Sequence, residues 1–167
     1  MQAVGAAEMD GSTGCGVYPG ELAAPADVLA LAGAYREAAI AIEGHGRKGD
    51  PISRAPYRLL AIHAIELYLN AHLLHSGREP SYVRGLQHDM AARGDQCVAG
   101  DLALRKRTAR HLRTIAANRE YLVTRYGPEF TRALPPISRL AATLEEVATK
   151  VARAMGPQPQ PAKVASP

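Results

Sequence analysis

Two arginines and two tyrosines lie close together in the stretch NREYLVTRYG, residues 118–127. The planar guanidinium groups of Arg119 and Arg125 suit phosphate binding, and the tyrosines can stack or donate a hydroxyl proton. The stretch therefore suggests three possibilities: a nucleotide or nucleic-acid site, a catalytic centre that stabilises an anion, or a helix whose polar groups serve only the fold. The elements that position these side chains must decide among them.

Helices dominate the prediction, because Ala, Leu and Arg are abundant and no stretch alternates cleanly between apolar and polar residues. Apolar residues make up 47% of the chain, enough for one core. The expected architecture is an all-α, up-and-down bundle of four to five helices. The helices are expected at 26–43, 55–76, 86–98 (with a possible break at Gly94), 103–126 and 136–154.

The composition at both ends differs from that of the helical region. Residues 1–23 are rich in Gly and Ala and are interpreted as a flexible leader, and the Pro-rich residues 156–167 as a disordered tail. The helical domain is thus expected at 24–155. No basic segment of a secretory signal and no apolar run long enough to cross a membrane is found, so the expected location is the cytoplasm, with no membrane partner.

Charged side chains are expected inside the bundle at two positions. On a helical wheel, Glu66 lies on the apolar face of 55–76, together with His63 and Asn70. Arg119 lies near the centre of the apolar stripe of 103–126. An ionised Glu inside a bundle needs a partner, so the simplest prediction pairs Arg119 with Glu66, with His88 completing a small polar network. The residues expected on the opposite face of 55–76 are Tyr57, Arg58, Tyr68, His72 and His75.

This predicted cluster supports two interpretations. A buried ion pair between two helices can be purely architectural. Alternatively, the same residues line a pocket or a dimer cleft, where Arg119 would bind a phosphate or stabilise an anionic transition state.

Three segments, RLLAIHAIELYLNAHLLHSG (58–77), GLQHDM (85–90) and NREYLVTRYG, resemble the small bacterial HEPN-domain proteins. The resemblance covers roughly residues 26–154. It implies a four- or five-helix bundle that usually dimerises. Many such proteins are ribonucleases of toxin–antitoxin or phage-defence systems, and others bind RNA, nucleotides or partner proteins without catalysis.

The family's catalytic motif is an Arg followed after four to six residues by a His, often with Asn after the Arg and Tyr two after the His. Arg119 matches the Arg and Tyr126 the Tyr, whereas Glu120 replaces the Asn and Thr124 the His. The family's ribonucleases need no metal, and the His is taken to transfer a proton during attack of the ribose 2′-hydroxyl on phosphate. A threonine cannot do so near neutral pH. In 55–76, Asn70 also stands where the family would have Lys.

The resemblance therefore implies a non-catalytic or degenerate protein that binds RNA, a nucleotide or a partner protein, with no cofactor. A homodimer is expected. The residues assigned to RNA or nucleotide binding are Arg119, Arg125, Tyr126, Glu66 and His88. Two alternatives stay open: an active endoribonuclease of a toxin–antitoxin or defence system, in which His88 or His63 replaces the missing histidine, and a pure protein-interaction module.

Other candidate sites are weaker. Arg58 with His63, and Arg105 with His111, match the loose Arg–His spacing, but each pair is separated by more than about 100° around a helix. The basic run RKRTARHLR (105–113) predicts either a solvated face or a patch that follows RNA phosphates, in a chain of net charge +4. The histidines of HLLH (72–75) lack a third ligand, so no metal site is expected.

Overall fold

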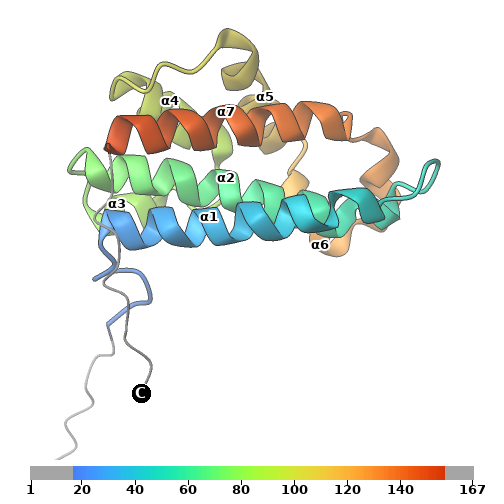
Figure 1. Ribbon diagram of the computed structural model, residues 1–167, viewed down its shortest axis with the longest axis horizontal. Helices are drawn as coiled ribbons and strands as arrows, with labels where there is room; N and C mark the ends of the chain where they lie inside the picture. The colour runs from blue at the N-terminus through green and yellow to red at the C-terminus, as the bar shows by residue number, and fades with distance from the viewer. Residues whose placement is uncertain (1–16, 157–167) are drawn as a thin grey trace, which may run out of the picture.

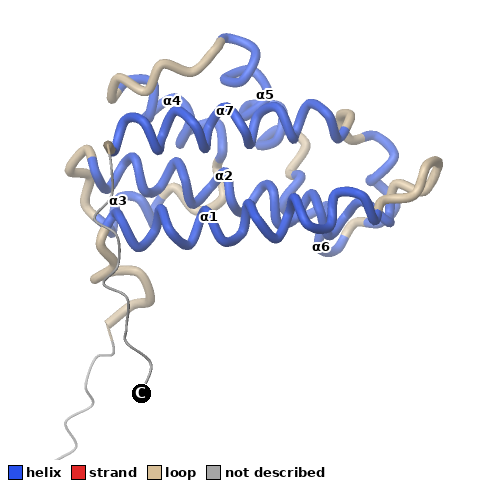
Figure 2. The backbone as a smooth tube through the Cα atoms, viewed as in Figure 1, coloured by secondary structure: helices blue, strands red, loops and turns tan. Residues whose placement is uncertain are grey.

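The computed structural model describes residues 17–156, and no β-strand occurs in this range (Figures 1 and 2). The prediction of an all-α bundle is confirmed. The α-helices are α1 (Pro25–Ile42), α2 (Ala55–His75), α3 (Pro80–Gly85), α4 (Met90–Ala99), α5 (Lys106–Ala117), α6 (Glu120–Tyr126) and α7 (Ile137–Met155). Three short 3-10 helices, η1 (Glu43–His45), η2 (Ile52–Arg54) and η3 (Pro128–Ala133), lie in the connections.

The three long helices α1, α2 and α7 lie side by side along the bundle (Figure 1). Helix α2 runs back along α1 after the loop that holds η1 and η2, and α7 starts at the same end of the bundle as α2. Helices α4 and α6 also pack against α2, and α4 packs against α5. Helix α3 contacts α2 as well, so the central position of α2 brings side chains from five other α-helices around it.

Local sequence signals explain where several helices begin and end. Pro25 is the first residue of α1, where its missing N–H costs no hydrogen bond. Asp89 caps α4, because its side chain accepts a hydrogen bond of 2.9 Å from the backbone N–H of Ala92. Gly77, with a φ of 82°, follows the end of α2 in the left-handed conformation that favours glycine.

Helix α2 is buried on almost every side, which corrects the prediction of one outward face. Tyr57, Arg58, Tyr68 and His72 are all buried, and only His75 of the predicted outward residues is exposed. A helix in the centre of a bundle has no solvated face along most of its length, and its sequence is correspondingly apolar nearly all round.

The predicted helix at 103–126 is divided into α5 and α6 by Asn118 and Arg119. Arg119 has a φ of 50°, a left-handed conformation that is uncommon outside glycine. The segment predicted as a helix at 86–98 begins only at Met90, while the region taken as a connection contains α3. Gly94 does not break α4. A Cβ atom there would lie 2.7 Å from Leu112 Cδ1, so glycine permits a close approach of α4 to α5.

The predicted leader and tail fall largely outside the described residues, which start at Val17 and end at Gly156. Within this range, no helix combines the length and the apolar character that crossing a membrane would need.

Candidate functional site

Glu66 on α2 is the centre of a polar cluster between α2 and α4. The Glu66 side chain is 10% exposed, and its carboxylate lies 3.2 Å from the guanidinium of Arg93 on α4. Nδ1 of His88, in the loop before α4, lies 3.2 Å from each carboxylate oxygen. The predicted contact between Glu66 and His88 is therefore present, but the cation that pairs with Glu66 is Arg93 and not Arg119.

Arg93 stabilises this cluster, because all three nitrogens of its guanidinium group donate hydrogen bonds. Nε donates to Oδ1 of Asn70 at 2.7 Å, and the two terminal nitrogens donate to the backbone carbonyls of Leu86 (3.3 Å) and Val83 (3.4 Å). Burial lowers the pKa of Arg93, and the nearby Glu66 carboxylate opposes that shift. The side chain is 3% exposed, so Arg93 ties α2, α3 and α4 together and is not free to bind a ligand.

His88 is the member of the cluster that solvent can reach, since 40% of its side chain is exposed. Its ring stacks on that of Tyr121, with the ring centres 4.5 Å apart and the planes tilted by 34°. When Nδ1 carries the proton that Glu66 accepts, Nε2 keeps its lone pair. A carboxylate that orients an imidazole in this way is the arrangement used by histidines that act as general bases.

Two adjoining cavities open around His88. One, of about 460 Å³, is lined by residues that include His88, Asp89, Arg119 and Tyr121. The other, of about 660 Å³, includes Glu66, Arg84, His88 and Arg93. Gly85, Gln87 and His88 line both. We call the combined space the His88 groove, lined chiefly by Glu66, Arg84, Gln87, His88, Arg93, Arg119 and Tyr121.

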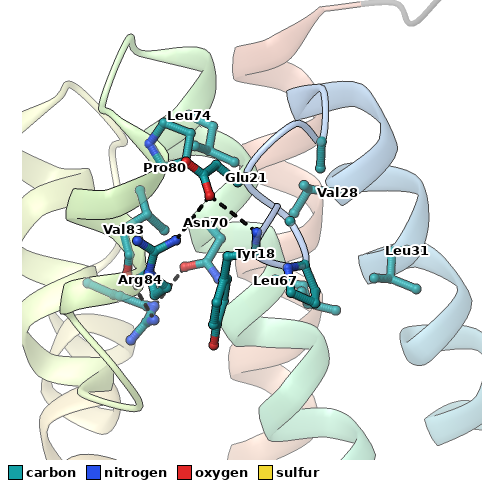
Figure 3. A pocket seen from close by; sticks show the side chains of 14 residues that line it. Tyr18, Glu21, Val28, Leu31, Leu67, Asn70, Leu74, Pro80, Val83 and Arg84 are labelled. Atoms are coloured by element: carbon teal, nitrogen blue, oxygen red, sulfur yellow. Dashed lines mark hydrogen bonds and ion pairs between the residues drawn. The ribbon is translucent and has the colours of Figure 1, made fainter. Parts of the chain in front are cut away.

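A third, apolar pocket of about 280 Å³ adjoins the groove and shares Tyr18, Arg84 and Arg93 with it. Figure 3 shows Leu67 and Leu74 of α2 and Val28 of α1 on its walls, with the Asn70 amide between them. The segment before α1 covers it: Glu21 lies 4.0 Å from the Arg84 guanidinium, which is also 4.5 Å from the centre of the Tyr18 ring. An apolar pocket thus lies beside a polar groove.

The backbone of the groove contains two unusual residues. Gln87 and Arg119 have φ values of 49° and 50°, and both line the cavity that contains His88 and Tyr121. Left-handed conformations of non-glycine residues tend to be retained where the surrounding structure or a function requires them. Here they place His88 after the end of α3 and direct Arg119 out of the helical core.

The predicted burial of Arg119 and its pairing with Glu66 are wrong. Arg119 is exposed because the helix is interrupted at Asn118. Arg119 then adopts a left-handed backbone conformation and is the residue before α6. The same break turns Glu120 inward, where it is fully buried and accepts a hydrogen bond of 3.2 Å from Arg58. Arg119 nevertheless lines the same cavity as His88.

Arg125 and Tyr126 are both exposed on α6, and Tyr126 is 76% exposed. Burial lowers the pKa of His63, Glu66 opposes this shift, and Arg125 and His88 add to it. Arg125 follows Tyr121 by one turn of α6, so it lies beside the groove but lines neither of its cavities. Tyr126 lines neither cavity of the groove. The five predicted binding residues therefore separate: His88, Glu66 and Arg119 come together, Arg125 lies close by, and Tyr126 points elsewhere.

Thr124 stands where the family motif has its histidine. Its hydroxyl donates to the backbone carbonyl of Glu120 at 2.9 Å, one turn earlier in α6. That bond is a common one for threonine in a helix and gives the side chain no role in proton transfer.

The other Arg–His pairs do not form sites. Arg58 bonds Glu120 and the carbonyl of Pro135, while His63 packs edge-on against Tyr35 at 4.4 Å. His111 is buried and bonds Thr143 at 2.7 Å, and its pKa is lowered to about 4, first by burial and then by Arg139, Arg58 and Arg107. Arg105 is exposed and its backbone N–H donates to Glu146. Among residues 17–156, no three His, Cys, Asp or Glu side chains are grouped to hold a metal ion.

Arg93, Arg84 and Tyr121 belong to the groove but were not among the predicted binding residues. A signal for Arg93 exists in the sequence: Met90, Arg93, Gly94 and Cys97 follow the spacing of one helix face, and all four are buried. A charged residue on that face needs a buried partner, and Glu66 was already predicted to need one. No comparable signal exists for Tyr121, because its position depends on the break at Asn118.

Comparison with known proteins provides no family for this chain: no family model, curated protein or solved structure shows a significant match. The function must therefore be argued from the groove itself.

Proposed function

We propose that the His88 groove binds RNA through the phosphate backbone, with Arg119 as the principal phosphate ligand and Arg125 close by. The observation that carries this proposal is that Arg119 lines the same cavity as His88 and Tyr121, and has no acidic partner within 4.0 Å among residues 17–156. Arg125 also lacks such a partner in that range. A guanidinium without a partner, beside an aromatic ring, suits a phosphate next to a stacked base.

The charge around the groove supports this proposal. Glu66 is neutralised by Arg93, and Asp89 is engaged as the cap of α4. Arg84 has a long, exposed ion pair with Glu21 and also lies over the ring of Tyr18. Three arginines line the groove, Arg84, Arg93 and Arg119, against two carboxylates, Glu66 and Asp89. This small excess of positive charge favours a polyanion. The resemblance of 58–90 and 118–127 to HEPN domains suggests the same class of ligand.

Replacing Arg119 with glutamine is expected to weaken RNA binding about tenfold and to reduce the slope of log affinity against log salt by about 0.7, as expected for one lost contact with single-stranded RNA. Fluorescence anisotropy with a labelled single-stranded RNA, measured over a series of salt concentrations, would detect both changes. A nucleoside triphosphate added as a competitor would show whether a nucleotide occupies the same groove.

The matched control is Arg153→Gln, which removes one exposed arginine at the far end of α7 and should change affinity less than twofold. Equal losses in Arg119→Gln and Arg153→Gln would indicate a general charge effect and would contradict the proposal. No RNA binding by the natural protein at low salt would favour a pure interaction module.

A second candidate function is RNA cleavage, and the Glu66–His88 geometry favours it. His88 would accept the proton of a ribose 2′-hydroxyl at Nε2. The hydroxyl oxygen would attack the adjacent phosphorus, the bond from phosphorus to the 5′-oxygen would break, and the 5′-oxygen would take a proton from water, giving a 2′,3′-cyclic phosphate. Arg119 would balance the charge that develops on the phosphate. Such a mechanism uses His88 where the family motif uses the residue at position 124.

Cleavage by His88 predicts a rate at least 100-fold lower in His88→Ala, within the usual range for a general acid–base group. Gel analysis of a labelled RNA would measure the rate, and a 2′-deoxy substitution at the cleaved position should abolish cleavage. The control is His75→Ala, which changes an exposed histidine at the end of α2. Cleavage that persists in His88→Ala, or its absence in the natural protein, would rule out this second function and leave the binding proposal standing.

A further inference from the structure

A separate cavity of about 390 Å³ lies at the end of the bundle where α2 and α7 begin. Its walls come from two stretches far apart in the sequence: the loop and 3-10 helix before α2 with the first turn of α2, and the segment from η3 to the first turn of α7. Four arginines line it, Arg47, Arg54, Arg58 and Arg132. It shares no lining residue with the His88 groove.

Only part of this positive charge is neutralised. Arg47 pairs with Asp50 at 2.6 Å, and Arg58 pairs with the buried Glu120 at 3.2 Å. Arg54 and Arg132 have no acidic partner within 4.0 Å among the residues that the structure describes. The proximity of Arg54 contributes to lowering the pKa of Arg58, after burial and against the larger opposing effect of Glu120. Like charges are thus held close together around one cavity.

The loop that carries two of these arginines is well ordered by its own hydrogen bonds. Ser53 Oγ accepts from the backbone N–H of Arg47 at 2.8 Å and donates to the carbonyl of Asp50 at 2.7 Å. Gly46 leaves space for the side chain of Arg54, because a Cβ atom there would lie 2.7 Å from Arg54 Cγ. The arrangement holds the stem of Arg54 against the loop.

The opposite wall adds a favourable backbone dipole. The 19-residue helix α7 starts at Ile137, immediately after Pro136, and no side chain caps it. Ser138, in its first turn, lines the cavity. The N-terminus of a helix of this length attracts an anion. The dipole here reinforces four arginines and does not define the site alone.

We propose that this cavity binds a small phosphorylated molecule through a diphosphate or longer phosphate chain. Arginine forks match pairs of phosphate oxygens. The two unpaired arginines come from opposite walls, Arg54 from η2 and Arg132 from η3, and the cavity is larger than one phosphate group needs. A bridging diphosphate would join the loop before α2 to the segment before α7. The proposal is independent of RNA binding at the His88 groove.

Titration calorimetry of the full chain with inorganic pyrophosphate, in a metal-free buffer at constant ionic strength, would test the proposal. The double variant Arg54→Gln/Arg132→Gln is expected to raise the Kd at least tenfold. Pyrophosphate should also raise the Tm of the natural protein more than chloride does at equal ionic strength, and this difference should disappear in the double variant.

Two control variants separate this cavity from other basic surfaces. Arg153→Gln and Arg119→Gln should both retain pyrophosphate binding within twofold. The proposal would be overturned if the natural protein bound no pyrophosphate, if the double variant bound it equally well, or if only Arg119→Gln lost binding. It would also be overturned if the double variant lost RNA affinity while retaining pyrophosphate affinity, since the ligand would then be RNA.

Discussion

Replacing Arg58 with methionine is expected to lower the free energy of unfolding by about 3–5 kcal/mol. Arg58 and Glu120 form an ion pair of 3.2 Å with side chains 7% and 0% exposed. Methionine would fill most of the arginine volume but leave the Glu120 carboxylate buried without its cation. The variant would also lose the hydrogen bond from Arg58 to the carbonyl of Pro135. Denaturation by urea would measure the change.

The loss should depend on pH in a defined direction. Burial raises the pKa of Glu120, although Arg58 and the Asn118 amide oppose this shift. A carboxyl whose folded pKa is raised contributes stability below its unfolded pKa, about 4.3, and loses that contribution as the pH rises through the folded value. Without Arg58, the folded pKa should rise further. The destabilisation should therefore be smaller at pH 4.5 than at pH 7.

The double variant Arg58→Met/Glu120→Leu provides the control, because it removes both charges. It should recover at least half of the stability lost in Arg58→Met and should not share its pH dependence. If the double variant were no more stable than the single one, the loss would come from packing or from Pro135 and not from an unpaired carboxylate.

The sequence predicted the type of each long helix, because the signals for these helices are local. Pro25 and Gly77 mark ends that the structure retains, and the pair Pro135-Pro136 precedes α7 as expected. The burial of α2 on nearly all sides depends on the helices that pack against it, and the sequence of α2 alone does not show this. A helical wheel of α2 alone therefore predicts Tyr68 and His72 on an outward face, although both are buried in the bundle.

The break between α5 and α6 explains the largest error at the site. Asn118 is a weak helix-end signal, and no glycine or proline accompanies it, so the local sequence does not clearly end the helix there. A continuous helix would direct Arg119 inward and Glu120 towards a different face. The observed break exchanges their roles, and Glu120 then pairs with Arg58. The contact between Glu120 and Arg58 of another helix fixes which residues of α6 face inward, and a helical wheel of one helix contains no such contact.

Two parts of the prediction for Glu66 are confirmed: the carboxylate pairs with a buried cation, and it lies close to His88. The cation is Arg93 and not Arg119, because Arg93 lies on the buried face of α4 and Arg119 lies outside the helices. Arg93 reaches Glu66 because α4 packs on α2 where Gly94 permits close contact with α5. Both buried Glu residues therefore have arginine partners, and Arg119 remains at the surface.

Replacing Arg93 with methionine is expected to lower the free energy of unfolding by about 3–5 kcal/mol, the range for breaking a buried pair. The change would leave Glu66 buried without its cation. The side-chain carbonyl of Asn70 and the backbone carbonyls of Val83 and Leu86 would also lose the hydrogen bonds that they accept from Arg93. Because these groups belong to α2, to α3 and to the loop before α4, the contacts between these elements should loosen together.

The stability of Arg93→Met is compared with that of His88→Ala. This comparison tests whether Arg93 stabilises the fold while His88 is available for a ligand. His88 is partly exposed, so its removal should lower the free energy of unfolding by no more than about 1 kcal/mol, as for other surface-accessible contacts. The same variant should have a much larger effect on RNA cleavage, if cleavage occurs. Urea denaturation of both variants at pH 7 would measure the contrast. A loss in His88→Ala as large as that in Arg93→Met would contradict it, because His88 would then be a structural partner of Glu66 and not a side chain held ready for a ligand.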